Sequence, residues 1–234
     1  MPQICIEELT ERFPDFRVAV VIAEGLTIGE RDGALDVEIA AAQARARARW
    51  VGVELSAISG VAAWRTAYRA FGIKKTSYRS SVERLLKRVL AGENLPRANA
   101  LVDLYNMISL DEGLCLGCDD LDRVTGDLAF RYARPGDSFI DMGAAPGEDP
   151  EDPPKPGEVV YADAAHVLCR RWNWRQDARS AVTTATRRVV LTAQSNGFGD
   201  VAAVGARLVG ALGRVCGGQA RFVVAERGAP TAQW

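Results

Sequence analysis

The sequence has no uninterrupted apolar run of the roughly 18 residues that a membrane-spanning helix needs. Its first residues, MPQICIEELTERF, are acidic and lack the apolar stretch that a secretory signal carries. We therefore expect no membrane partner and a cytoplasmic location. The sequence also has no internal repeat, and its 234 residues suit a single domain spanning 1–234.

The sequence is equally poor in residues and motifs that carry catalysis or hold a cofactor. Its one histidine is His166, and it contains neither a GxGxxG nor a P-loop sequence, so we expect no cofactor. Five cysteines, an odd number in a chain of this size, do not indicate a disulfide framework. The spacings Cys115-x2-Cys118 and His166-x2-Cys169 are compatible with a four-ligand zinc site, although cysteine is often simply buried. We predict a metal-free protein, with zinc on these four residues as the alternative.

The formal net charge of −1 does not by itself predict a nucleic-acid partner, but the charges are unevenly placed. Between positions 64 and 100, nine Lys and Arg residues stand against two Glu residues. A second basic cluster extends from 170 to 188, and acids concentrate between 111 and 163. One interpretation is a solvated surface whose charges cancel nearby. The other is a basic face that binds phosphates through Arg84, Lys87, Arg88, Arg170 and Arg171.

Apolar periodicity predicts helices early in the chain and mostly strands later. The apolar run 17–23 is predicted to be a buried strand. Helices are expected over 34–51, 60–71, 80–90, 99–108 and 200–215. Strands are expected over 127–133, 138–141, 158–161, 167–169, 188–193 and, as the last one, 221–225. Residues 143–158, rich in Pro, Gly and acids, predict a mobile loop, and the whole pattern predicts an α+β fold with mixed sheet layers and packed helices.

The helix expected over 80–90 has the clearest local signal. It opens with Ser80-Ser81-Val82-Glu83, which has the form of a capping box. Its basic residues lie on the face opposite its apolar ones, which is why that face is a candidate for phosphate binding.

The segment LPRANALVDLYNMISLDEGLCLGCDDLDRVTGDLAFRYARPGD (95–137) resembles the B3/B4 editing domain of the bacterial phenylalanyl-tRNA synthetase β subunit. SSVERLLKRVL (80–90), GEVVYAD (157–163) and RRWNWRQD (170–177) are similar to free-standing members of that family. The resemblance covers about 16–193, and the helix and strand within 200–225 complete the domain. It implies an α+β domain that hydrolyses misacylated tRNA, typically tyrosine on the phenylalanine tRNA. The partner would then be the aminoacylated 3′ end of a tRNA, and not DNA.

The resemblance also implies roles for residues of the segment. Asn106 would bind the ribose or the attacking water, and the amides of Gly113 and Gly117 would face the oxyanion. An aminoacyl ester is already activated, so a positioned water and oxyanion donors suffice without a protein base. Asp103 and Asp120 are expected either to bind the substrate or to cap helices and turns.

The sequence departs from the family at two places. The stretch 113–120 reads GLCLGCDD, interpreted as a Gly-rich loop, with Gly117 where the family has its pocket histidine. WNWRQD replaces a Gly-Gly-Glu segment, and Asp177, rather than Ala178, is preferred for the glutamate that senses a tyrosine hydroxyl. The amino-acid specificity is therefore expected to differ.

Two tryptophans flanked by arginines form a second candidate surface. Trp172 and Trp174 are placed to stack on the terminal adenine, or else to enter the core from one side of a strand. Asn173 and Arg175 would then face the other side and meet the substrate.

These observations favour a trans-acting hydrolase of misacylated tRNA esters. The alternatives are a non-catalytic module that binds tRNA or an aminoacyl group, favoured by the missing histidine, and a small-molecule pocket protein that does not meet RNA. The sequence predicts neither the amino acid, nor the tRNA, nor the oligomeric state.

Overall fold

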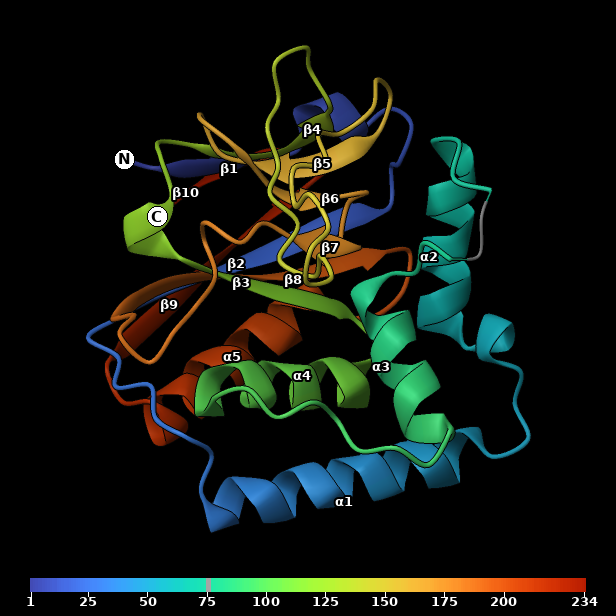
Figure 1. The fold of residues 1–234 in the computed structure, drawn as a ribbon, viewed down its shortest axis with the longest axis vertical. Coiled ribbons are helices and arrows are strands. Elements are labelled where there is room, and N and C mark those ends of the chain that lie inside the picture. The colour runs from blue at the N-terminus through green and yellow to red at the C-terminus, as the bar shows by residue number, and fades with distance from the viewer. Residues whose placement is uncertain (75–76) are drawn as a thin grey trace.

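The computed structural model of the protein describes residues 1–74 and 77–234. Lys75, which belongs to the first basic cluster of the sequence, lies outside the described residues. The α-helices of the described part are α1 (Gly33–Trp50), α2 (Ser59–Ala70), α3 (Ser81–Leu90), α4 (Ala100–Glu112) and α5 (Val201–Val215). Figure 1 shows α1 at the bottom, α4 and α5 above it, two β-sheets above these, and α2 and α3 at one side. This layered arrangement is an α+β fold, as the sequence predicted.

A four-stranded antiparallel sheet packs directly on α4 and α5. Its strands follow the order β3 (Cys115–Asp120), β8 (Arg188–Asn196), β2 (Phe16–Glu24) and β9 (Gln219–Glu226). Residues 18–23 of β2 are all buried, because helices cover one face of the sheet and the second sheet covers the other. Burial on both faces explains why the apolar run 17–23, from which this strand was predicted, is continuous and does not alternate with polar residues.

A second sheet of six strands lies on the other face. Its strands follow the order β10 (Thr231–Gln233), β1 (Gln3–Cys5), β4 (Leu128–Tyr132), β5 (Val159–Ala162), β6 (Val167–Arg170) and β7 (Arg175–Gln176). The β1–β4 pair is parallel and the other pairs are antiparallel. Single turns of 3₁₀ helix occur at Glu7–Leu9, Leu55–Ala57 and Leu121–Arg123.

Several local predictions are confirmed. Ser80 caps α3 by accepting a hydrogen bond from the Glu83 amide at 3.4 Å. The Glu83 carboxylate, however, does not complete a reciprocal box, since it pairs with Arg65 at 2.7 Å and with Arg79 at 3.1 Å. Residues 143–158 carry no helix or strand, apart from an isolated bridge at Glu151.

Other local predictions are wrong. The stretch 113–120 is not a Gly-rich loop, because residues 115–120 form β3 at the edge of the four-stranded sheet. The strand expected over 138–141 is reduced to isolated bridges at Ile140 and Asp141. The strand β9 is not the last one, since β10 follows it and pairs with β1. The bridges at 140 and 141 and the strand β10 are short, and β3 contains a glycine and two aspartates, so none of them leaves a clear hydrophobic pattern in the sequence.

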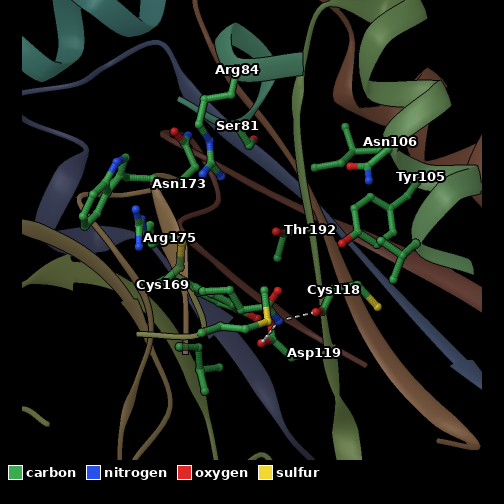
Figure 2. A pocket seen from close by; sticks show the side chains of 18 of the residues that line it. Ser81, Arg84, Tyr105, Asn106, Cys118, Asp119, Cys169, Asn173, Arg175 and Thr192 are labelled. Atoms are coloured by element: carbon green, nitrogen blue, oxygen red, sulfur yellow. Dashed lines mark hydrogen bonds between the residues drawn. The ribbon is translucent and has the colours of Figure 1, made fainter. Parts of the chain in front are cut away.

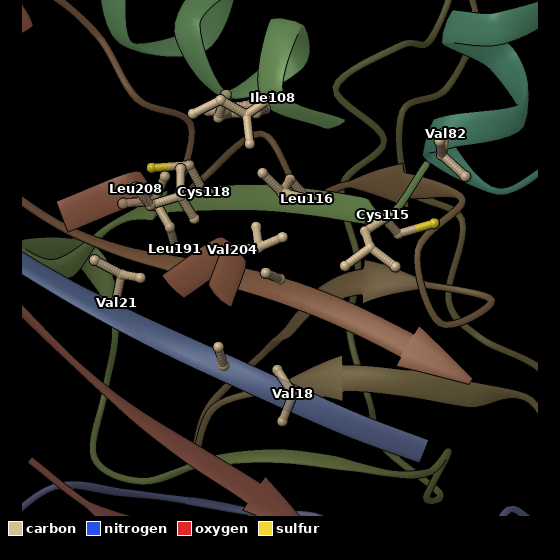
Figure 3. Close-up of a cluster of buried hydrophobic side chains, with 14 of the residues drawn as sticks. Val18, Val21, Val82, Ile108, Cys115, Leu116, Cys118, Leu191, Val204 and Leu208 are labelled. Carbon is tan, nitrogen blue, oxygen red and sulfur yellow. The ribbon is translucent and has the colours of Figure 1, made fainter. Parts of the chain in front are cut away.

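The core lies between these layers. Figure 3 shows Ile108 of α4 and Leu208 of α5 near Cys118 and Leu191 of the four-stranded sheet, all of them buried. Between the sheets and α2, Phe16 makes edge-on contacts with Phe130 and Trp172, at 5.2 and 4.8 Å between ring centroids. None of the helices in the described ranges is long and apolar enough to cross a membrane.

Candidate functional site

A cavity of about 530 Å³ opens where α3, α4 and β3 meet the β6–β7 end of the six-stranded sheet. This volume is within the range of roughly 300–1,000 Å³ that is typical of small-molecule sites. The residues that line it on the helical side include Ser81, Arg84, Arg88, Tyr105 and Asn106. Those on the side of the sheets include Gly117, Asp119, Tyr161, Asn173, Arg175, Gln176 and Thr192. Figure 2 shows side chains from both sides converging on this space.

Asn106 enters the cavity from α4. Its side chain is half-buried and makes no hydrogen bond with any residue in the described ranges. The neighbouring Tyr105 hydroxyl also points into the space in Figure 2. Burial raises the pKa of Tyr105 well above its ordinary value, so this phenol stays protonated and can donate a hydrogen bond. α4 therefore presents an uncommitted amide and a hydroxyl to a ligand.

Asp119 of β3 lies on the opposite wall and is almost fully buried. Its Oδ1 accepts hydrogen bonds from Ser180 Oγ at 2.6 Å and from Gln176 Nε2 at 2.8 Å. Burial raises the pKa of Asp119 to about 7, although these two hydrogen bonds act in the opposite direction. Its second oxygen, Oδ2, has no partner within the described part of the chain. The carboxyl group can therefore be neutral or ionised near pH 7, with one oxygen left for a ligand.

Sequence reasoning missed Asp119, because only its neighbour Asp120 stands at a position with a family counterpart. The alternation of side chains between the two faces of a strand could have identified Asp119. If residues 115–120 are read as a strand, Gly117 and Asp119 share one face.

A chain of hydrogen bonds crosses the back of the cavity. The Tyr68 hydroxyl donates to Asn173 Oδ1 at 2.9 Å, and Asn173 Nδ2 donates to Gln194 Oε1 at 3.1 Å. Gln194 Nε2 then donates to Thr192 Oγ1 at 2.9 Å. Asn173 was expected to bind substrate; it lines the cavity, but both ends of its amide are engaged in this chain.

The mouth of the cavity is basic. Arg84 lines it, Lys87 follows one turn later on the exposed face of α3, and neither has an acidic partner in the described ranges. Arg88 also lines it, but pairs with Glu93 at 3.0 Å. Arg175 was expected to bind substrate; it lines the cavity while paired with Asp141 at 2.6 Å.

The second basic cluster does not offer Arg170 and Arg171 at its surface. Arg170 is fully buried and makes a two-pronged contact with Glu158, at 3.1 and 2.7 Å. Arg171 is also buried, with its guanidinium over the Trp174 ring at 4.3 Å from the centroid. These two arginines hold the β5–β7 region together and present no cation to a phosphate, contrary to the sequence-based prediction.

The two tryptophans do not share a strand face. Residues 171–174 form a tight turn in which Arg171 and Trp172 have φ of 45° and 67°, values that side chains other than glycine rarely adopt. The turn sends Trp172 into the core, where it meets Phe13 edge-on at 4.7 Å. Trp174 alone lines the cavity. Trp172 is thus unavailable for stacking on a base.

Three aspartates expected near the substrate lie outside the cavity lining. Asp103 accepts a hydrogen bond from the Ala98 amide at 2.9 Å, and Asp120 accepts one from Thr186 Oγ1 at 2.7 Å. Asp177 accepts from the Ile140 amide and binds Arg179, both at 2.7 Å. Each carboxylate holds local backbone in place, which is the capping alternative for Asp103 and Asp120.

The two glycines expected to supply oxyanion donors do not have free amides. Gly113 ends α4 in the left-handed region with φ of 70°, and its amide donates to the Ser109 carbonyl at 2.9 Å. Gly117 lines the cavity, but its backbone groups point toward β8. The Cys118 carbonyl accepts a hydrogen bond from Gln176, and the Asp120 amide donates one to the Ser180 carbonyl, so the backbone groups of these two residues point away from β8. Because backbone groups alternate in direction along a strand, those of Gly117 point toward β8.

The cysteines do not assemble into a metal site in the described ranges, where no group of three or more His, Cys, Asp or Glu residues could hold an ion. Cys115 and Cys118, three residues apart in β3, project to opposite faces of the sheet. Burial raises the pKa of Cys115 to about 11, which disfavours the thiolate that zinc requires.

Comparison with known proteins gives a family and structural likenesses. A family model described as the B3/4 domain matches residues 63–202. The chain is similar to the crystal structure of an N-terminal fragment of the phenylalanyl-tRNA synthetase beta-subunit from Pyrococcus horikoshii, with 14% identity and a TM-score of 0.46. That match covers 94% of this chain and 53% of the other, so the chain spans about half the length of that fragment. None of the curated proteins matches.

Proposed function

The chain belongs to the B3/4 domain family, and we propose that it hydrolyses the ester of a misacylated tRNA presented at its 3′ end. The observation that carries this proposal is the cavity of about 530 Å³, with uncommitted hydrogen-bonding groups inside and unpaired cations at its mouth. A tRNA end has matching chemistry, because phosphates lead to a ribose that carries a polar aminoacyl group.

The groups of the cavity fit ester hydrolysis without a nucleophilic side chain. Asn106 is free to orient the attacking water or the ribose, and the Tyr105 hydroxyl is free to donate to a developing oxyanion. The cavity walls exclude part of the bulk solvent, which strengthens both contacts. No histidine lines the cavity, so proton transfer falls to water and the neighbouring ribose hydroxyl.

The proposal also replaces the expected oxyanion donors. The amides of Gly113 and Gly117 are consumed by the α4 cap and by the strand pairing, so side-chain donors must take their role. Of the three residues that the sequence indicated for catalysis, Asn106, Gly113 and Gly117, the proposal keeps Asn106.

The test is a panel of misacylated tRNAs incubated with the purified protein, with release of the amino acid measured over time. We expect hydrolysis of at least one ester, and Asn106→Ala should lower that rate by about 10²–10³ while tRNA affinity changes little. The matched control is Asn94→Ala, an exposed asparagine outside the cavity lining, which should keep the rate.

The missing histidine favours one rival, a module that binds tRNA or an aminoacyl group without hydrolysing it. Salt-dependent tRNA binding with no release from any member of the panel would select this rival. A fully active Asn106→Ala would instead reject the assignment of the catalytic contact to α4.

A further inference from the structure

We propose that Asp119 and Thr192 form a subsite for the α-amino ester group itself, which deepens the proposed function and rests on it. Asp119 Oδ2 binds the protonated α-amino group of the aminoacyl ester, and the Thr192 hydroxyl donates a hydrogen bond to the ester carbonyl. The substrate class is then an ester of an amino acid with a free, charged α-amine, whatever its side chain.

The sheet register places the two groups at a suitable separation. Gly117 of β3 lies directly opposite Thr192 of β8, and Asp119 is two residues further along β3 on the same face. Asp119 and Thr192 are therefore diagonal neighbours, with Cβ atoms somewhat less than about 7–8 Å apart. In an α-amino ester the nitrogen and the carbonyl oxygen lie about 3 Å apart, so one group of this kind can bridge the two side chains.

The glycine between them keeps the space open. A Cβ at Gly117 would lie 3.8 Å from Thr192 Oγ1, and any larger side chain would occupy the region between the two residues. Gly117 therefore leaves room for the ligand, even though its amide is bonded to β8 and cannot donate to the ligand.

The hydrogen-bond chain at the back of the cavity fixes the direction of the Thr192 hydroxyl. Tyr68 donates into the chain at one end, so Asn173 and Gln194 each accept on their oxygen and donate from their nitrogen. Thr192 Oγ1 receives the last of these bonds and has no acceptor for its own hydrogen among the described residues. That hydrogen is left for a ligand in the cavity, which makes Thr192 a positioned donor.

Asp119 makes no ion pair in the described ranges, although Arg84, Arg88 and Arg175 also line the cavity. Both hydrogen bonds that it accepts come from neutral donors, Gln176 and Ser180. The titratable groups that influence it or respond to its charge are Asp163, Asp177, Tyr105, Tyr161, Cys118 and Cys169. All of these groups become negatively charged when they ionise, so none of them can neutralise the Asp119 carboxylate. The ammonium group of the substrate would supply that positive charge. Binding should then favour ionised Asp119 and release a proton when the pH is below 7.

Two hydrolysis-resistant probes test the subsite. Both carry an acyl group amide-linked to the 3′ position of 3′-amino-3′-deoxyadenosine; one acyl group is an α-amino acid and the other is the same group without its α-amine. Calorimetry at about pH 6, in two buffers of different ionisation enthalpy, gives affinity and proton release for each probe. For the unmodified protein we expect the amine probe to bind at least about tenfold more tightly and to release close to one proton.

Variants separate the two contacts. Asp119→Asn preserves an oxygen for Ser180 and Gln176, and should reduce the preference for the amine probe to about onefold and abolish the proton release. Thr192→Val should weaken both probes by a similar factor, whereas Thr192→Ser should bind as the unmodified protein does. Asp15→Asn, at an exposed position outside the cavity, is the control that should change nothing.

Equal affinity of the unmodified protein for the two probes would overturn the subsite while leaving the proposed function intact. This comparison uses the unmodified protein alone, so it does not depend on whether a variant folds. Binding of neither probe, with no hydrolysis of any misacylated tRNA, would overturn both.

Discussion

The buried carboxyl group of Asp119 should make the stability of the protein depend on pH in a calculable way. The pKa of Asp119 is about 7 in the folded protein, against an ordinary value of 3.8 that applies to the unfolded chain. Because the folded state holds this proton more tightly, stability is greatest below the unfolded value and falls as the pH rises through 7. The difference of roughly 3 pH units, at about 1.4 kcal/mol per unit, amounts to about 4 kcal/mol.

Asp119→Asn removes this titration while an amide oxygen can still accept from Ser180 and Gln176. Its free energy of unfolding, relative to the unmodified protein, should rise by about 3 kcal/mol between about pH 5 and about pH 8.5. Urea unfolding at several pH values measures this difference, with Asp15→Asn, at an exposed position, as the control. Parallel curves for the variant and the unmodified protein would refute the reasoning, since a group that ionises equally in both states contributes no slope.

Three further outcomes are expected. Replacing Arg84 and Lys87 together by Glu should weaken tRNA binding and lower the slope of log affinity against log salt by roughly 2, with circular dichroism unchanged; an unchanged slope would make this face a solvated surface. Glu158→Gln should lower the free energy of unfolding by about 3–5 kcal/mol in urea, because Arg170 loses its main counter-charge while fully buried. Gly117→Ala should keep the fold, since its Cβ would lie 3.8 Å from the nearest atom, and should weaken the amine probe; unaltered calorimetric affinity would place the ligand elsewhere.

Elements with long apolar patterns could be predicted from the sequence, and those without such patterns could not. β2 buries most of its residues, and α5 buries one face at helical spacing, so both patterns are visible in the sequence. β3 is an edge strand with two aspartates and a glycine, a composition that is typical of a loop. Its pairing with β8 depends on residues about 75 positions away, which no local pattern records.

The candidate site was predicted in part. The place of Asn106 in the cavity was expected from the family resemblance of the segment 95–137, and α4, which carries it, was expected from the sequence. The separation of Trp172 from Trp174 was not accessible, because it depends on a turn with two positive φ angles at residues that do not favour them. The backbone cost of that turn is repaid by burying Trp172 among four aromatic rings.

The distribution of charge decides how an RNA could be held. Most arginines of the second basic cluster are paired with carboxylates, among them Arg170 with Glu158 and Arg175 with Asp141, so their fields largely cancel at a distance. A molecule with a net charge of −1 then has little long-range attraction for RNA. Arg84 and Lys87, which have no acidic partner in the described ranges, stand at the mouth of the cavity and beside it. Attraction by these two cations would orient the 3′ end toward the cavity while contributing only a few phosphate contacts. The proposed tRNA binding should therefore involve few phosphate contacts, and its selectivity should come from the aminoacylated 3′ end that enters the cavity.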